Sequence, residues 1–579
     1  MSRAGGERAS VRTSSEAGVS PARGLATRQG VGLGGPLALG FLVLVAAAPL
    51  AAALFRAASS EGGLSRALSQ ALADPATFAA LAFGLKEAAA SALLALLIGL
   101  PGAWLVARHD FPGKRLLKAL AGVPFCVPPI LVVLAFVLYF GRNGYANRLL
   151  MALFGLKEPP LGFLYSFWGL VFVHGFYNFP VVLQSVGDAW ASIPRDREEA
   201  ARTLGAGRLR SFAVGLLPSL LPSIVQSSAL VFLFCFFSFV VVLVFGPLGG
   251  STLEVEVYRA ARMNADQAGA AALALVETVA ALGVVLLLGL AERRQVAAAR
   301  RSGAAQATGR ARGAALVVLC LYALFLLLFF AGPLLSLAAE AFTERRGMAG
   351  PGGFGLGNFA RLFFGTGAAG ASAGDLASLA AFGKGPLLGA LGDTLGTAIP
   401  AALLATFAGG GAALLLRGRK GALVEAALSL PLAVSGVVLA LGWSFLFPSA
   451  GRGLVILVEA VATLPFTARS VSAALASIDR SPVLAARTLG ASRLRAAWDV
   501  ELRSALPVLL TSGAFAFSMA AGDASAALLI GAPGFEPLPL LVYRLVGAYR
   551  FPEACAAGLV LALATGVIFF AKDREAFHA

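Results

Sequence analysis

The chain has 579 residues, of which 58% are apolar and 13% are charged, and its mean hydropathy is +0.82. A soluble protein of this length needs far more polar surface, so the composition excludes a soluble globular protein and indicates a lipid bilayer. The net charge of +16 is typical of basic cytoplasmic loops in a membrane protein, so we expect no nucleic-acid partner. The isolated cysteines Cys126, Cys235, Cys320 and Cys555 predict no metal site.

Residues 1–33 contain five arginines among Gly, Ser and Ala and predict a basic cytoplasmic tail. A bilayer core of about 30 Å needs roughly 20 apolar residues per helix. Twelve stretches qualify: 34–55, 86–107, 118–140, 163–186, 213–245, 267–291, 314–337, 393–416, 421–446, 453–471, 505–530 and 553–571. The sequence therefore predicts an all-α polytopic membrane protein with about 12 transmembrane helices. The stretch 213–245 is long for one span, so its first turns lie at the cytoplasmic surface or the helix tilts strongly.

Basic residues cluster in alternate loops, which sets the predicted orientation. Because Lys and Arg stay on the cytoplasmic side, their distribution favours both termini inside the cell. Residues 292–313 are then a cytoplasmic linker between two permease halves, 34–291 and 314–579. The clearest cytoplasmic clusters are Arg108, Lys114 and Arg115; Arg293, Arg294, Arg300, Arg301, Arg310 and Arg312; and Arg417, Arg419 and Lys420.

The two halves contain an internal repeat. A shift of 285 residues aligns SIPRDREEAARTLGAGRLR (192–210) with SIDRSPVLAARTLGASRLR (477–495), with 13 of the 19 positions identical. An even number of spans per half gives both halves the same orientation, so the repeat is parallel and a pathway between the halves is expected.

Polar side chains inside spans are costly, and they usually face a cavity or a partner helix. His174 and Asn178 lie one turn apart just before Pro180, and the repeat register pairs His174 with Glu459. Asp523 is a further acid, in the eleventh span. We interpret His174, Asn178, Glu459 and Asp523 as candidates for the translocation path, and hydrogen bonds that set helix packing are the alternative. Further candidates are Gln184, Gln226 and Glu277.

Both repeated segments lie in a cytoplasmic loop between the fourth and fifth spans, at about 192–218 and 477–507. Each contains Ala-Ala-Arg-Thr-Leu-Gly, which predicts a short helix that a left-handed glycine ends. Small side chains let another protein's groove approach the backbone, and nearby arginines orient it. The candidate docking residues are Glu199, Ala200, Ala201, Arg202, Leu204, Gly205, Ala485, Ala486, Arg487, Leu489 and Gly490.

These loops resemble the EAA loop of the permease subunits of binding-protein-dependent ABC importers: Glu-Ala-Ala, three residues, Gly, nine residues, Ile, one residue, Leu-Pro. In the first half the loop departs only at Gly215, which replaces the Ile. In the second half Val500 and Leu502 fit, whereas Leu484 replaces the Glu and Arg503 replaces the Pro. The resemblance covers nearly the whole chain and implies a type I importer permease fold, built from two parallel six-helix repeats.

The resemblance also implies partners. Each loop is expected to dock one of two copies of an ABC ATPase subunit, which holds ATP and Mg, while an extracytoplasmic binding protein delivers the substrate. The chain has no GxxxxGK[ST] motif, so we expect no ATP hydrolysis, no catalytic residue and no cofactor on this subunit. The predicted location is the inner membrane.

Two substrates remain open at this point. The fused two-half form resembles the thiamine and the ferric iron permeases. The segments that are more similar to the thiamine permease are GRNGY (141–145), FVHGFYNFP (172–180), the stretch from Phe236 through STLEVEVYRA (251–260), the Gly-Asp pair at 522–523, and LPLLVYRLVGAYR (538–550). Ferric iron is the alternative. A secondary transporter of the twelve-helix facilitator type is the alternative from another class; it requires a charged signature after the second span of each half, where this chain has RHDFPGKR and only RGRK.

Overall fold

The computed structural model describes residues 34–120, 127–194, 196–246, 250–299, 309–344, 353–365, 385–416, 430–449, 451–477 and 481–571. The predicted basic tail, residues 1–33, lies outside these ranges. The described chain is almost wholly helical, which confirms the all-α prediction. Its only strands are two short pairs, the parallel pair of β1 (His109–Asp110) with β2 (Gly309–Arg310) and the antiparallel pair of β3 (Thr343–Glu344) with β4 (Gly353–Phe354).

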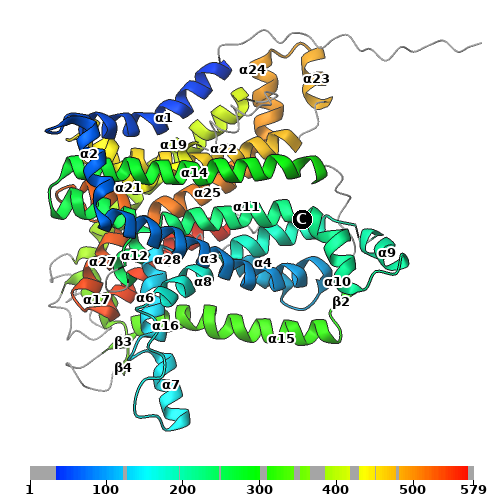
Figure 1. Cartoon of the computed structure of the whole chain (residues 1–579), viewed down its shortest axis with the longest axis horizontal. Coiled ribbons are helices and arrows are strands. Elements are labelled where there is room, and N and C mark those ends of the chain that lie inside the picture. Colours follow the sequence, from blue (N-terminus) through cyan, green and yellow to red (C-terminus); the bar gives the residue numbers. More distant parts are fainter. Residues whose placement is uncertain are drawn as a thin grey trace, which may run out of the picture.

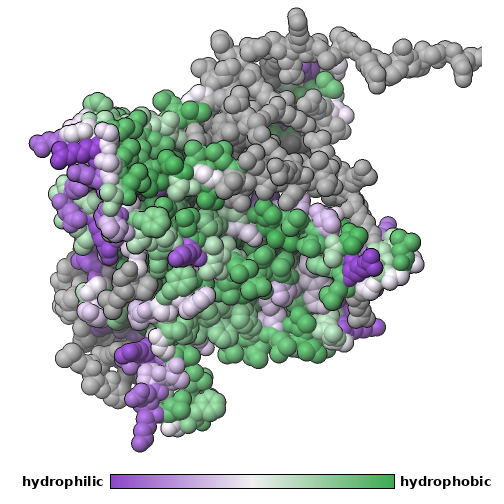
Figure 2. Space-filling view, in the orientation of Figure 1, coloured by the Kyte–Doolittle hydropathy of each residue, from purple (hydrophilic) through white to green (hydrophobic). Residues whose placement is uncertain are grey.

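Long apolar helices run side by side through the molecule (Figure 1). Within the described residues, nine are long and apolar enough to cross a membrane, and a tenth span results if the pair α1 and α2, bent by 95°, is counted as one. An apolar belt covers the middle of the visible face, and hydrophilic side chains gather towards its edges (Figure 2). These spans contain α1 (Gly34–Ala58), α2 (Gly63–Ala73), α3 (Pro75–Arg108), α6 (Pro129–Phe140), α8 (Phe167–Ala191), α11 (Leu217–Phe236), α14 (Gln267–Ala299), α15 (Ala314–Leu326), η3 (Leu327–Ala331), α16 (Gly332–Ala341), α19 (Pro386–Leu416), α22 (Arg452–Ser477) and α25 (Arg503–Gly522). Two further apolar helices are α21 (Gly436–Leu446) and α28 (Phe551–Ala571).

Each of the twelve predicted stretches contains helix, but several are interrupted. The stretch 213–245 is two helices: it breaks at Phe237 and Ser238 between α11 and α12 (Phe239–Phe245). The stretch 505–530 breaks at Asp523 and Ala524 between α25 and α26 (Ser525–Ile530). Backbone that leaves a helix at membrane depth must be buried in protein or line a cavity, so these breaks indicate where the interior of the molecule is polar. The helix α14 continues to Ala299, into the segment predicted as the linker.

Smaller elements connect the spans. They are α4 (Lys114–Leu120), α7 (Tyr145–Phe154), α9 (Asp196–Thr203), α10 (Arg208–Ser211), η1 (Phe212–Leu216), α13 (Leu253–Tyr258), η2 (Arg259–Met263), α17 (Gly357–Phe364), η5 (Leu430–Ala433), α23 (Ser481–Thr488), α24 (Arg493–Ala496), η6 (Ala497–Leu502) and α27 (Leu538–Gly547).

The sequence repeat is also a repeat of structure. The helices α8, α9 and α13 begin 285 residues before α22, α23 and α27. Upstream the offset is larger, because α6 begins at residue 129 and α21 at residue 436. The first half contains the additional helix α7 between α6 and α8, and this insertion accounts for the change in offset. Helix α7 projects away from the rest of the molecule (Figure 1).

The two halves exchange their first helices. Helix α1 packs on α21 and α19 of the second half, and α16 packs on α6 of the first half. Both contacts are close: a β-carbon at Gly442 of α21 would clash with the carbonyl of Pro49 in α1, and one at Gly332 of α16 would lie 2.7 Å from the ring of Tyr139 in α6. One hydrophobic core therefore extends through both halves.

Candidate functional site

The two candidate docking helices, α9 and α23, have the same geometry. The amide of Ala206 donates to the carbonyl of Ala201 (3.0 Å), and the amide of Ala491 donates to that of Ala486 (3.0 Å). This six-to-one hydrogen bond ends a helix at a left-handed residue. That residue is glycine in both loops, with φ of +84° at Gly205. The repeated sequence thus builds the same helix and turn twice.

Each turn exposes one apolar side chain to solvent. Leu204 and Leu489 are both 88% exposed, directly before the two glycines. The other predicted docking residues, Glu199, Ala200, Arg202, Ala485 and Arg487, are also exposed, whereas Ala201 and Ala486 are half-buried. An exposed leucine therefore recurs at equivalent positions of the two loops.

The loops differ in how they are fixed to the membrane helices. In the first half Glu198 of α9 forms an ion pair with Arg108 at the end of α3 (3.4 Å), and its carbonyl accepts a hydrogen bond from Ser211 (2.8 Å). Val483 occupies the position of Glu198 in the second half, so this ion pair has no counterpart there. Next to Arg108, β1 pairs with β2, which belongs to the predicted linker.

A cavity of about 260 Å³ lies between the two halves. All four predicted pathway residues, His174, Asn178, Glu459 and Asp523, line it. Its wall comes from α8, the α11–α12 break and α13 of the first half, and from α21, α22 and the α25–α26 break of the second half. The α11–α12 break and the α25–α26 break both border this cavity. This placement is expected, because irregular backbone at membrane depth must be buried in protein or line a cavity.

His174 is held by buried hydrogen bonds on both ring nitrogens. Nδ1 lies 2.6 Å from Oε1 of Glu87, and Nε2 lies 2.8 Å from the hydroxyl of Ser238. Glu87 also accepts a hydrogen bond from Ser91 (2.5 Å). Asn178 donates from Nδ2 to the carbonyl of His174 (3.0 Å). These bonds fix the α8 side of the cavity to α3 and to the α11–α12 break.

The equivalent positions in the second half carry acids. Glu459 stands where the first half has His174, and Asp523 stands where it has Ser238. The carboxylate of Asp523 accepts from the amides of Ser525 (2.9 Å) and Ala526 (3.5 Å) and so begins α26. Glu459 is 4% exposed, and its Oε2 has no hydrogen-bond partner.

The sequence did not identify Glu254, which lines the cavity from α13. It lies between the predicted spans 213–245 and 267–291, and a six-residue helix gives too little periodicity to identify. Two signals were available: an acid within the apolar run LEVEVY, and the similarity of the segment STLEVEVYRA (251–260) to the thiamine permease. Behind it, Glu277 of α14 is buried, and neither of its carboxylate oxygens has a hydrogen-bond partner among the residues that the structure describes. Helices α13, α14 and α21 pack together at this point.

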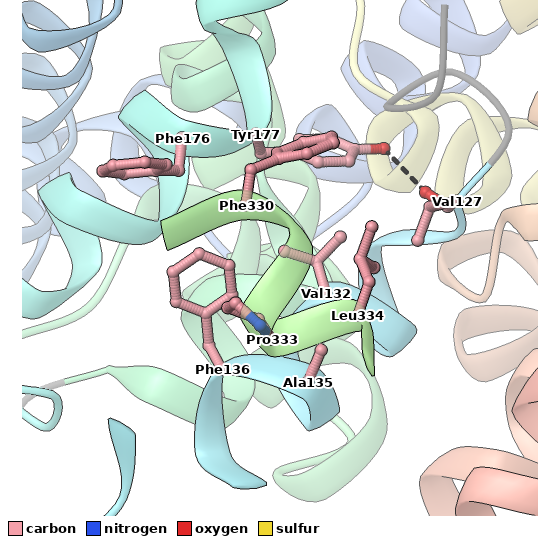
Figure 3. A pocket seen from close by; sticks show the side chains of 9 residues that line it. All are labelled: Val127, Val132, Ala135, Phe136, Phe176, Tyr177, Phe330, Pro333 and Leu334. Carbon is pink, nitrogen blue, oxygen red and sulfur yellow. Dashed lines mark hydrogen bonds between the residues drawn. The ribbon is translucent and has the colours of Figure 1, made fainter. Parts of the chain in front are cut away.

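A small apolar pocket adjoins the cavity, and Tyr177 lies at its edge (Figure 3). Its volume of about 20 Å³ is room for roughly one water molecule. Tyr177 and Val127 line both this pocket and the cavity. The hydroxyl of Tyr177 donates to the carbonyl of Val127 (3.1 Å), next to Phe330, so its ring is held at the boundary between the two spaces (Figure 3).

Among the described residues there is no group of three or more His, Cys, Asp or Glu side chains arranged to hold a metal ion.

Comparisons with known proteins agree with this architecture. Residues 95–332 and 398–574 match the family model described as "Binding-protein-dependent transport system inner membrane component". The thiamine transport system permease protein of Brucella abortus (strain 2308) is 28% identical over 565 residues, which cover 94% of this chain and 95% of that protein.

Two further relatives differ in how much of the chain they cover. The thiamine transport system permease protein of Escherichia coli (strain K12) is 27% identical over 519 residues, which are 85% of this chain and 88% of that protein. The putative 2-aminoethylphosphonate transport system permease protein of Salmonella typhi is 33% identical over 199 residues, which are only 34% of this chain and 69% of that protein.

Proposed function

The chain belongs to the family of binding-protein-dependent transport system inner membrane components, and we propose that it forms the thiamine pathway of an ATP-driven importer. Members of this family are multi-pass permease subunits of ABC importers, and they work with an ATPase and a substrate-binding protein. The secondary-transporter alternative is therefore wrong. The full-length similarity to thiamine permeases carries the proposal for the substrate, and ferric iron is not favoured.

The cavity between the halves supports a pathway at this place. It is lined by both halves, and polar groups and helix breaks meet there. In membrane transporters, broken helices at the interface between repeats commonly surround the substrate. His174, Asn178, Glu459 and Asp523 are in our proposal the polar part of this pathway.

The two loops are in our proposal the ATPase contacts, one copy of the ATPase on each loop. ATP and Mg then stay on those subunits. Closure of the two ATPases would draw α9 and α23 together, and because the halves share one core and exchange their first helices, the movement reaches the cavity.

The proposed orientation places these loops and both termini in the cytoplasm. Basic residues near the loops support it: Arg108 and the β2 residue Arg310 lie on the same side of the molecule as α9. The binding protein would then meet the opposite side, which carries α7, α17 and α27 (Figure 1).

The decisive experiment is ATP hydrolysis by the permease–ATPase complex in lipid, measured with its binding protein loaded with thiamine, loaded with ferric ion, or empty. Stimulation by the thiamine-loaded form supports the proposal. Stimulation only by the iron-loaded form would leave the importer in place and reject thiamine as its substrate. The same preparation gives the number of ATPase copies from its mass.

A further inference from the structure

The cavity wall is acidic. Glu254, Glu459 and Asp523 line it, while the described residues of its wall include no lysine or arginine. His174 is the remaining titratable nitrogen there, and both of its ring nitrogens already contact partners, Glu87 and Ser238. The described wall therefore offers no basic side chain that could balance these acids in their ionised form.

Two of the three acids have hydrogen-bonding capacity that the protein leaves unused. Glu254 is 2% exposed and Glu459 is 4% exposed, and within the described part of the chain the Oε2 atom of each is buried without a hydrogen-bond partner. Asp523 differs, because both of its oxygens accept backbone amides at the start of α26. It lies within electrostatic range of Glu254 and of Glu459, so the three acids act on one space. Buried carboxylates without partners are costly, and such groups are normally paired.

Aromatic side chains complete the wall. Tyr177, Phe234, Phe237 and Phe239 line the same cavity. Aromatic faces attract organic cations, especially ones whose charge is spread over a ring or a quaternary nitrogen. The volume of about 260 Å³ exceeds by far the roughly 15 Å³ that one water molecule needs, so a small organic molecule has room.

We propose that the permease itself has a binding site for an organic cation in this cavity, in which Glu254 of the first half and Glu459 of the second half supply the opposing charge. The identity of the cation as thiamine, whose thiazolium ring is positively charged, rests on the proposed function. Specificity then resides in the membrane subunit as well as in the binding protein.

The placement of the two acids suggests how release occurs. Glu254 is on α13 and Glu459 is on α22, so one carboxylate belongs to each half. A cation between them interacts with both halves at once. When the halves move relative to each other, one carboxylate leaves the cation and the affinity falls.

The test is equilibrium binding of thiamine to the permease–ATPase complex in lipid nanodiscs without the binding protein. Thiochrome, the neutral oxidation product of thiamine, serves as the uncharged comparison. We expect saturable thiamine binding that is at least about tenfold tighter than thiochrome binding. Glu254→Gln and Glu459→Gln should each weaken thiamine binding about tenfold or more and leave thiochrome binding within about twofold.

The matched control is Glu340→Gln. Glu340 is also buried, at 2% exposure, but it bonds to Tyr145 and is not part of the cavity wall. We expect its thiamine affinity to stay within about twofold of the unmodified complex. Co-purification of the ATPase shows that each variant assembles. The preference of the unmodified complex for thiamine over thiochrome tests the site independently of any substitution.

The outcomes separate this inference from the proposed function. If thiamine drives ATP hydrolysis with the binding protein but the Gln variants bind it normally, the cation site is rejected and the thiamine importer stands. If thiamine does not bind but choline, another organic cation, binds and depends on Glu254 and Glu459, the cation site stands and thiamine is rejected. If neither cation binds the unmodified complex, the cation site is rejected.

Discussion

Leu204 and Leu489 allow the docking proposal to be tested without disturbing the fold. Each is 88% exposed, so replacement by alanine should change the free energy of unfolding by less than about 0.5 kcal/mol. The substitution removes three carbon groups, worth about 0.8 kcal/mol each when buried. If the ATPase covers the leucine fully, each substitution costs about 2 kcal/mol of docking energy, which is about 30-fold in the dissociation constant.

The assay is titration of the purified permease in nanodiscs with the ATPase subunit, followed by mass photometry. Leu153→Ala is the matched control, because Leu153 is 67% exposed on α7, at the far end of the molecule from α9 (Figure 1). We expect Leu204→Ala and Leu489→Ala each to weaken one of two docking events while the control weakens neither. ATPase affinities that stay within about twofold in both variants would refute the assignment of these loops as docking sites.

Three further predictions concern the same loops and the cavity. Gly205→Ala and Gly490→Ala add a β-carbon where φ is +84° and +91° but no atom lies within 4 Å. We expect backbone strain to lower the local stability of the loop by about 1 kcal/mol, measured as faster amide exchange there. Unchanged exchange would contradict this expectation. Glu198→Gln removes the charge that pairs with Arg108, and we expect about 0.5–1 kcal/mol less stability in the first loop, measured by amide exchange of α9 against α23; equal changes in both loops would be inconsistent with it. His174→Ala leaves buried groups without partners, which costs about 1–3 kcal/mol and should lower the thermal unfolding midpoint; an unchanged midpoint would show that those hydrogen bonds do not stabilise the fold.

Local features of this chain were predictable because local residues determine them. The end of each loop helix follows from a glycine after Ala-Ala-Arg-Thr-Leu, since only glycine adopts the left-handed conformation without strain. The spans follow from apolar runs, and their parallel arrangement in two halves follows from the repeat. His174 and Glu459 attracted attention because polar groups inside spans are costly.

Contacts between distant parts of the chain were not predictable in the same way. The bond between Glu87 and His174 joins residues 87 positions apart, and no periodicity in either helix specifies it. The helix breaks at Ser238 and Asp523 depend on the cavity that they border. A count of apolar residues does not detect them, so the predicted stretches 213–245 and 505–530 each extend across a break. Glu254 was missed for a related reason, because its burial depends on the packing of α13 against α14 and α21.

The repeat register explains why one cavity can serve a cation although it is built from two similar halves. In the first half, His174 is hydrogen-bonded through one ring nitrogen to Ser238 and through the other to Glu87. At the positions of His174 and Ser238 the second half has Glu459 and Asp523. Both halves therefore share the scaffold and the two loops, while these two positions place acids in the second half where the first half has a histidine and a serine. Restoring the symmetry with Glu459→His should, by this reasoning, cost cation binding while leaving the docking loops intact.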